Sequence, residues 1–168
     1  RQRAARLAQT IVFTSQGTPF MFAGEEVFRD KKGVHNSYKS PDSINAIDWN
    51  LKHKNSEQFE YYRQLIKLRK EHPAFRMTTA DQISRHLVFD EKTDENVISY
   101  TLRDHANGDV WKEIKVVFNG NPKAMEVKVA KRNWTVIAED GRIDADGLGS
   151  SRGGKISVAP TSALILAR

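Results

Sequence analysis

A chain of 168 residues, 39% hydrophobic and 29% charged, is long enough to bury a core and to form one or two domains. No apolar run approaches the roughly 18 residues that a membrane span needs, and the absence of cysteine excludes disulfides and thiolate metal sites. The net charge of +6 lies wholly in residues 1–76, which carry 14 Lys or Arg and 8 Asp or Glu. These basic residues lack interleaved aromatics that would stack on bases, so we expect solvated faces and no nucleic-acid partner.

The first predicted element is an amphipathic helix over residues 1–13. Small and apolar residues recur there at helical spacing, at Ala4, Leu7, Ala8 and Ile11. Gly17 suits the position just beyond the end of this helix. The chain starts at Arg1 without an initiator Met or a signal-peptide pattern, as the middle of a longer polypeptide would.

Residues 20–23, Phe-Met-Phe-Ala, predict a buried strand. No polar residue alternates with them, so the strand would be apolar on both faces, as in the centre of a parallel sheet covered by helices. Pro19 fits only at the start of such a strand, and Gly24 marks its end. A polar loop leaving the carboxyl end of such a strand is where α/β enzymes place ligand-binding groups.

The polar loop that follows contains one short helical turn, starting at Pro41 or Asp42, and leads into a second helix over residues 56–70. Asn55 or the serine after it is the predicted N-cap, and Gln58 is placed to close a capping box on Asn55. A proline shortly after the apolar stripe stops this helix. This part of the chain therefore predicts the order helix, strand, loop, helix.

After Pro73 the hydrophobic period changes to two, which predicts strands. Three strands are clear, at 97–102, 114–118 and 125–129. Weaker strands are predicted at 83–89, 134–138, 155–158 and 163–166. Between them, at 107–108, 119–120, 140–141 and 153–154, lie pairs of residues that tolerate the positive φ of tight turns. Such a series of short strands and turns predicts an antiparallel β-sandwich.

The strand predicted in the first half has no parallel neighbour in this chain. If Phe20, Met21 and Phe22 lacked sheet partners, each unburied side chain would forfeit about 1.5–3 kcal/mol. The sum rivals the whole stability of a small domain. We therefore infer that residues 1–75 are the last piece of a larger α/β body, and that residues 76–168 form a separate sandwich that folds alone.

Residues 16–26, Gln-Gly-Thr-Pro-Phe-Met-Phe-Ala-Gly-Glu-Glu, closely resemble the segment that follows the catalytic regions of type I pullulanases, in the α-amylase clan of glycoside hydrolases. The likeness continues through Arg29, Lys31, Gly33, Asn36-Ser37-Tyr38, Pro41-Asp42, Asn45 and Asp48-Trp49. Residues 160–166 resemble the closing strand of that family's C-terminal β-domain. The resemblance is specific over residues 16–49, more than thirty residues with few gaps, and looser after Pro73.

The resemblance implies an α+β fragment. Residues 1–75 would be the last helix-strand-loop-helix of a (β/α)8 TIM barrel, that is, the C-terminal end of its catalytic barrel, and residues 76–168 a C-terminal antiparallel β-sandwich domain. The remainder of the catalytic barrel, upstream of Arg1, would then be the partner of this chain. The compartment stays open, with a secreted or bacterial cell-envelope location favoured over the cytoplasm.

The family's reaction, as the resemblance implies it, is hydrolysis of α-1,6 branch linkages in pullulan, glycogen or starch-derived oligosaccharides with retention of configuration. Retaining chemistry needs two carboxyls about 5 Å apart, one attacking and one protonating the leaving oxygen. In the family the catalytic acids lie upstream of the matched segment, the last of them in a His-Asp motif. This chain has no His-Asp pair, so no catalytic residue is assigned and we expect the chain alone to be inactive.

The resemblance implies substrate contacts in the loop. Asn36 and Tyr38 match positions that touch glucose units on the non-reducing side of the cut. An amide and a phenol suit this role, because planar polar groups bind sugar hydroxyls and rings cover their apolar faces. Arg29, Asp42 and Asn45 are further candidates that could equally hold the loop in shape.

Two other groups of carboxylates carry weaker signals. Glu25 and Glu26 are adjacent on an extended segment and point opposite ways, so we expect Glu26 to brace the loop, through Arg29, instead of acting in catalysis. Asp140, Asp144 and Asp146 lack the ligand set of a calcium loop, so a hairpin turn is favoured. The histidines show no metal-ligand spacing, and neither a metal nor a cofactor is implied.

A second hypothesis belongs to a different class. The chain could be a stand-alone carbohydrate-binding or structural β-module with a helical N-terminal extension. The favoured hypothesis makes the polar loop a glucan contact that works only when the rest of the barrel is present.

Overall fold

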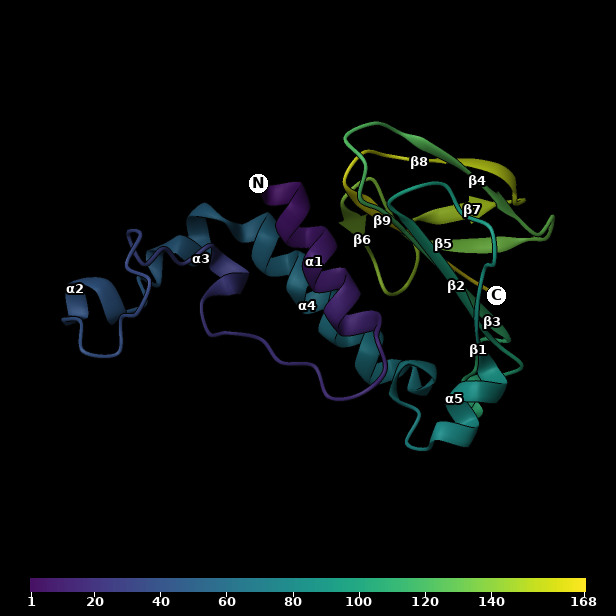
Figure 1. Cartoon of the computed structure of the whole chain (residues 1–168), viewed down its shortest axis with the longest axis horizontal. Helices are drawn as coiled ribbons and strands as arrows, with labels where there is room; N and C mark the ends of the chain where they lie inside the picture. Colours follow the sequence, from purple (N-terminus) through teal and green to yellow (C-terminus); the bar gives the residue numbers. More distant parts are fainter.

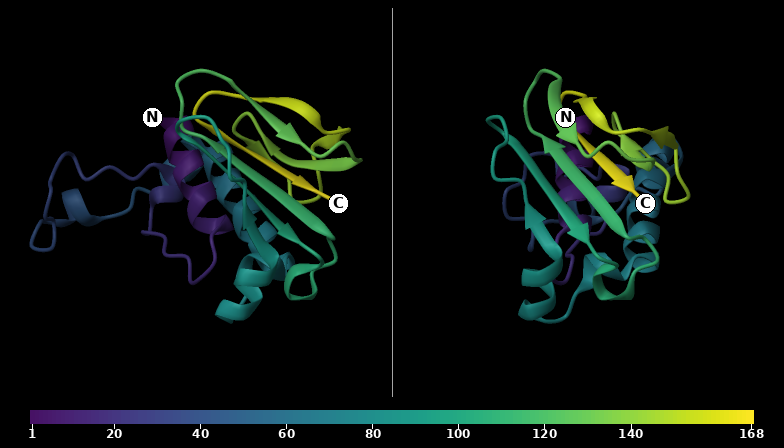
Figure 2. Two further views of the ribbon diagram at one scale, coloured as in Figure 1. Left: turned by 45° about the vertical axis from the view of Figure 1, so that its right-hand side comes forward. Right: turned by 90° about the vertical axis from the view of Figure 1, so that its right-hand side faces the viewer.

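One layer of helices and two of sheet make up the structure, a computed structural model that describes all of residues 1–168 (Figure 1). Helices α1 (Gln2–Thr14) and α4 (Ser56–Glu71) pack against one face of a seven-stranded sheet, and a two-stranded sheet covers the other face. The right-hand view of Figure 2 shows the helices behind the larger sheet. The central strands of the larger sheet are therefore buried on both faces.

The other helical elements are short: η1 (Glu25–Val27), α2 (Asp42–Asn45), α3 (Asn50–Lys54), η2 (Pro73–Arg76), α5 (Ala80–His86) and η3 (Ala106–Gly108). The predicted helices at both ends of the first region and the short turn at Asp42 are confirmed, and α3 was not predicted. Buried Arg69 on α4 donates to the carbonyls of Phe13, Ser15 and Gly17, at 2.8 and 2.7 Å for the first two. These bonds satisfy carbonyls that the end of α1 leaves without a helical partner.

The predicted capping box at the start of α4 does not form. Asn55 stands at the N-cap, but its Nδ2 donates to the Val27 carbonyl at 2.9 Å. Gln58 is buried, and its Oε1 accepts from Arg6 Nε of α1 at 2.9 Å. Contacts with neighbouring elements have thus taken both side chains away from the local motif.

The strand predicted at Phe20–Ala23 is wrong for this chain. The segment is a loop that no strand accompanies, as Figure 1 shows. The Phe20 side chain is 82% exposed and that of Phe22 46% exposed. A strand needs a hydrogen-bonding neighbour, and every strand of the structure lies in the antiparallel sheets of residues 87–167.

The strands are β1 (Leu87–Phe89), β2 (Val97–Arg103), β3 (Glu113–Asn119), β4 (Met125–Val129), β5 (Trp134–Glu139), β6 (Arg142–Ile143), β7 (Gly149–Ser151), β8 (Gly154–Val158) and β9 (Ser162–Ala167). The larger sheet has the order β1-β2-β3-β9-β5-β6, with β7 also paired to β5, and β4 pairs with β8. All pairs are antiparallel, so the predicted sandwich is confirmed, although β6 and β7 were not predicted. Asp140 and Gly141, at φ 47° and 72°, form the predicted turn between β5 and β6.

The strand predicted at 83–89 is replaced by α5 over most of its length. Thr79 caps this helix, because its side-chain oxygen accepts from the Gln82 amide at 3.2 Å. Only Leu87–Phe89 pair as a strand, at the edge of the larger sheet. The local capping signal therefore outweighs the β preference of Ile83.

The core lies in two main clusters, one on each face of the larger sheet. Between the sheets pack Val97, Val117, Val129, Trp134, Val136, Val158, Leu164 and Leu166. The other cluster holds 17 buried residues, among them Leu7, Leu68 and Phe75 from the helical side and Tyr100 and Phe118 from the sheet. This larger cluster crosses residue 75, and the division of the chain into two domains there stays a proposal.

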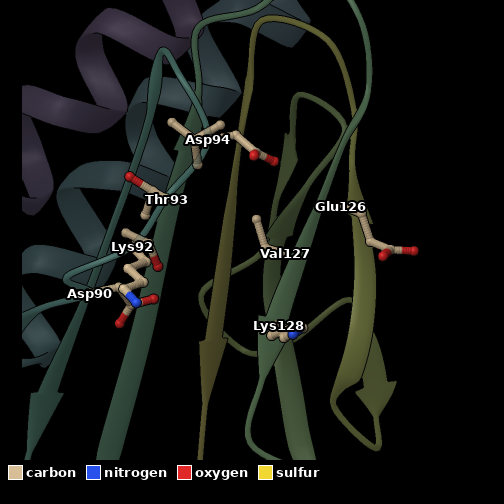
Figure 3. Close-up of a pocket in the computed structure, with 9 residues that line it drawn as sticks. Asp90, Lys92, Thr93, Asp94, Glu126, Val127 and Lys128 are labelled. Atoms are coloured by element: carbon tan, nitrogen blue, oxygen red, sulfur yellow. The ribbon is translucent and has the colours of Figure 1, made fainter.

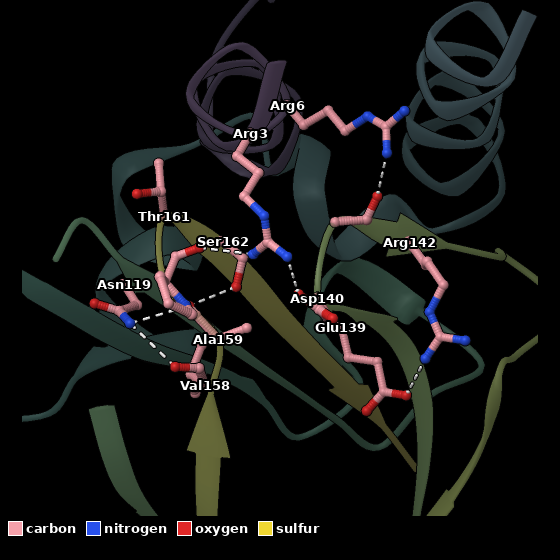
Figure 4. A network of polar contacts seen from close by, with 12 residues as sticks. Arg3, Arg6, Asn119, Glu139, Asp140, Arg142, Val158, Ala159, Thr161 and Ser162 are labelled. Carbon is pink, nitrogen blue, oxygen red and sulfur yellow. Dashed lines mark hydrogen bonds and ion pairs between the residues drawn. The ribbon is translucent and has the colours of Figure 1, made fainter. Parts of the chain in front are cut away.

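Polar contacts join the start of α1 to the sheet (Figure 4). Arg3 donates to Asp140 Oδ1 at 2.6 Å and to the Pro160 carbonyl at 2.9 Å. Arg6 donates to the Gly141 carbonyl at 2.9 Å. The β5–β6 turn is therefore fixed against the helical layer.

A second joint links the end of α4 to the loop between β2 and β3. The Asp109 carboxylate, 2% exposed, accepts from His72 Nδ1 at 3.0 Å, from the Ala74 amide at 3.1 Å and from the Trp111 amide at 2.9 Å. The Trp111 ring stacks on His72 with centroids 3.3 Å apart. Burial alone would raise the pKa of Asp109, but these hydrogen bonds, led by that of His72, hold it below its usual value.

Candidate functional site

Residues Arg29–Asp48 form an arm that extends away from both the helices and the sheets, with α2 at its far end (Figures 1 and 2). At its base the Arg29 amide donates to the Gly24 carbonyl at 2.8 Å. Gly24 has φ +99°, and a Cβ there would lie 2.6 Å from Arg29 Cδ. The turn into the arm therefore requires glycine at this position.

Side chains within the arm brace its backbone. Lys31 Nζ donates to Ser37 Oγ and to Asn45 Oδ1, both at 2.7 Å. Asn45 Nδ2 donates to the carbonyls of Ser37 and Ser40, also at 2.7 Å, and the Asn45 carbonyl accepts from Arg29 Nη2. The arm thus holds its shape through contacts that it makes with itself.

Two cations share one aromatic ring at the base of the arm. Arg29 Cζ lies 5.4 Å and Lys31 Nζ 5.5 Å from the centroid of the Phe22 ring. Loss of solvation, followed by the positive charge of Arg29, lowers the pKa of Lys31. Arg29 Nε is buried without a hydrogen-bond partner. The two like charges stay close because the hydrogen bonds described above fix them.

The five residues predicted to bind substrate separate into two groups. Asn36, Tyr38 and Asp42 are exposed, Tyr38 at 76%, and their side chains make no hydrogen bonds within the chain. The side chains of Arg29 and Asn45 already donate hydrogen bonds to backbone carbonyls of the arm and its base. The structure therefore leaves the first three without a hydrogen-bond partner and gives the other two a bracing role. Lys39 Nζ lies 5.4 Å from the centroid of the Tyr38 ring.

Sequence reasoning gave no role to Lys31 or Ser37, although both belong to the resembling motif. Their contacts join residues several positions apart across the arm, and no periodic pattern reveals such pairs. The one available signal is the clustering of polar residues around Asn36 and Tyr38. Lys31 makes two side-chain hydrogen bonds across the arm, so it is the one to test.

We expect Lys31→Met to loosen the arm. The change removes two hydrogen bonds from an ammonium group, and the population of open arms should rise about tenfold or more. Limited chymotrypsin digestion at Tyr38 measures this population. Lys32→Met is the matched control, because Lys32 Nζ makes one exposed hydrogen bond to the Ser43 carbonyl. Equal cleavage rates in the two variants would contradict the bracing role.

The adjacent carboxylates at the base of the arm are structural. Glu25 accepts from Gln9 Nε2 of α1 at 2.8 Å, and Glu26 accepts from the Gly24 amide at 2.9 Å. Glu26 therefore braces the loop as predicted, but through Gly24 and not through Arg29. The two groups have separate partners and do not form a catalytic pair.

The aspartates near the β5–β6 turn also have local partners. Asp140 binds Arg3, Asp146 binds Lys67 Nζ at 2.5 Å, and Asp144 accepts from the Asp146 amide at 2.9 Å. No three His, Cys, Asp or Glu side chains in the structure gather in a way that could hold a metal ion. No helix has the length and apolar character to cross a bilayer.

A hollow of about 400 Å³ lies between the β1–β2 loop and β4, lined by groups of both charges (Figure 3). Both oxygens of Asp90 accept from Lys115 Nζ at 2.7 Å. Glu126 lies across the hollow from Asp94 with its carboxylate directed away from the loop. These carboxylates do not converge, so the hollow lacks the arrangement that acid-base hydrolysis requires.

Comparison with known proteins shows that this chain is similar to pullulanases. Residues 83–142 match the family model described as pullulanase, all-beta domain. The pullulanase of Bacillus subtilis is 46% identical over 121 residues, which are 72% of this chain and 17% of that protein. The structure of a pullulanase from Bacillus acidopullulyticus aligns with a TM-score of 0.94 at 40% identity, over 99% of this chain and 20% of that one.

A second solved structure is a pullulanase from Anoxybacillus sp. LM18-11 complexed with maltotetraose. It aligns with a TM-score of 0.89 at 37% identity, over 99% of this chain and 23% of that chain. Our chain thus spans between 17% and 23% of the length of these relatives. The likeness extends over both the helical layer and the sandwich.

Proposed function

Because this chain belongs to the pullulanase family, we propose that it works as part of a retaining glycoside hydrolase. The chain is similar to the C-terminal portion of the type I enzymes. The proposed enzyme cleaves α-1,6-glucosidic linkages in pullulan, glycogen or starch. The observation that carries the proposal is the arm, which is braced from within and leaves Asn36 and Tyr38 free. A solved relative carries maltotetraose, which supports an α-glucan as the ligand.

In this proposal the catalytic acids come from the remainder of the barrel, and the 168-residue chain alone is inactive. Residues 1–75 contribute the last helix, loop and helix of that barrel, and Phe20–Ala23, a loop in this structure, pairs as a strand only beside the rest of the barrel. The solvent exposure of Phe20 and Phe22 supports this role, because a neighbouring strand would bury both rings. Burial would recover about 1.5–3 kcal/mol for each ring.

The substrate contacts are tested in the complete enzyme that contains this chain. We expect Asn36→Ala and Tyr38→Ala each to raise KM for pullulan about tenfold, because each removes one sugar contact of roughly 1.4 kcal/mol. The value of kcat should change less, since neither group touches the reacting atoms. Ser43→Ala, also exposed on the arm, is the control. Unchanged KM values in both variants would refute a sugar-binding arm.

A second candidate function is a stand-alone carbohydrate-binding module. The observation that favours it is that the arm draws its bracing contacts from this chain and presents Tyr38 without help. Electrophoresis of the 168-residue chain in pullulan gels separates the two functions. The hydrolase proposal expects no retardation and no hydrolysis, whereas clear retardation would favour the module.

A further inference from the structure

Basic side chains on β4 and β8 face one another across the smaller sheet. Lys128 and Lys155 are direct partners in the antiparallel register, and both are exposed. Like charges directly opposite on neighbouring strands destabilise a sheet. Lys155 is relieved by Glu126 at 2.8 Å, but Lys128 forms no ion pair.

The loops after β4 and before β8 bring further cations to the same end of the sandwich. The Arg132 amide donates to the Arg152 carbonyl at 3.0 Å, which ties the two loops together. Gly153 has φ +68°, and a Cβ there would lie 2.1 Å from the Ala130 carbonyl oxygen. The loops therefore approach as closely as backbone permits, and the cations that they carry are held near one another.

The charge at this end is only partly balanced. Arg132 pairs with Glu113 at 2.8 Å, whereas Lys131 and Arg152 form no ion pair. Lys131, Arg132, Asn133, Arg152 and Gly153 line a hollow of about 440 Å³, and Lys131 also lines a neighbouring one of about 490 Å³ with Lys128 and Lys155. We call these two neighbouring spaces, which share Lys131, the basic hollow. Three of its cations, Lys128, Lys131 and Arg152, form no ion pair.

We propose that the basic hollow binds an oxyanion of the phosphate type, either free phosphate or a phosphate ester. Holding cations together costs free energy, and a bound anion offsets this cost. The guanidinium of Arg152 offers a fork that matches phosphate oxygens, and Lys131 adds a point charge. The smaller space of the hollow has no apolar side chain and the larger has one, that of Val129, so a charged ligand fits the hollow better than a hydrocarbon or the face of a sugar ring.

The basic hollow is separate from the arm. Figure 1 places the β4–β5 and β7–β8 loops at the end of the molecule farthest from α2. Binding at the hollow therefore does not depend on the glucan contact proposed above. Each proposal can fail without affecting the other.

Titration of the ¹⁵N-labelled chain with inorganic phosphate, and separately with glucose 6-phosphate, tests the site. We expect saturable shifts confined to the amides of 131–133 and 152–153, with a dissociation constant on the order of 1 mM that weakens with added salt. Lys131→Ala and Arg152→Ala should each weaken binding about tenfold. Lys70→Ala, which removes an exposed positive charge from α4, should leave binding unchanged.

The two ligands distinguish the source of the phosphate. Equal affinity assigns free phosphate, and tighter binding of glucose 6-phosphate assigns a sugar ester, with glucose as the uncharged control. Shifts spread over all basic surfaces, or equal loss in Lys70→Ala, would overturn the site. A second measurement is independent: without ligand, Lys128→Gln should raise Tm by relieving the repulsion from Lys155, and the gain in Tm on adding phosphate should shrink.

Discussion

Residues 76–168 expressed alone should bind hydrophobic dyes and give a poorly dispersed NMR spectrum, although the sequence predicts that they fold independently. One face of the larger sheet loses the cover of Leu7, Leu68 and Phe75 in this truncation. The side chains left open include Tyr100, Leu102, Ile114, Val116, Phe118 and Ile165. At about 1.5–3 kcal/mol for each side chain, their exposure rivals the stability of a whole domain.

A control variant separates the loss of the helical layer from the loss of the arm. A version of the full chain in which a short glycine linker replaces residues 30–47 is the control, because it removes most of the arm and keeps the helical layer. That control should stay folded with an unchanged core. A dispersed spectrum without dye binding from residues 76–168 would instead establish an independent sandwich, with its boundary at residue 75.

Asp109→Ala should lower the free energy of unfolding by about 3 kcal/mol or more. The change leaves His72 Nδ1 and the amides of Ala74 and Trp111 without their acceptor in a buried position. Urea denaturation measures the loss. Asp81→Ala is the control, because Asp81 forms an exposed pair with Arg85 within α5, and such pairs contribute about 0.5 kcal/mol.

The stability lost in Asp109→Ala should depend on pH. The pKa of Asp109 is lower in the folded state than in the unfolded chain, so its contribution is complete above the unfolded value of about 4. The contribution disappears as pH falls through the folded value. The stability difference between wild type and Asp109→Ala should therefore shrink below about pH 4. A difference that stays constant throughout the acid range would show that the carboxylate is not the source.

Local sequence patterns correctly predicted those elements whose packing partners lie within this chain. The stripes of α1 and α4 and the alternation in β2 each have a buried face to match, and β3, which also alternates, is buried on both faces. Prediction failed where a contact with another segment, or the lack of one, decided the conformation. Phe20–Ala23 has the composition of a strand but no neighbour, and Gln58 has the spacing of a cap but binds Arg6.

The candidate site was predictable only in part. The resemblance pointed to the loop and to its five residues, but only coordinates show that Tyr38 is exposed while Asn45 is turned inward and occupied. The basic hollow had no signal at all, because Lys128 and Lys155 are far apart in sequence and the pairing of β4 with β8 brings them together. Strand pairing is a long-range property that no short window of sequence contains.

The internal bracing of the arm has a consequence for how this protein can vary. Lys31, Ser37, Ser40 and Asn45 satisfy one another, and Gly24 makes the turn into the arm. We therefore expect that another loop can replace the arm between the same two ends. A different tip could be grafted between the same two ends, altering ligand preference while the scaffold that carries it keeps its architecture.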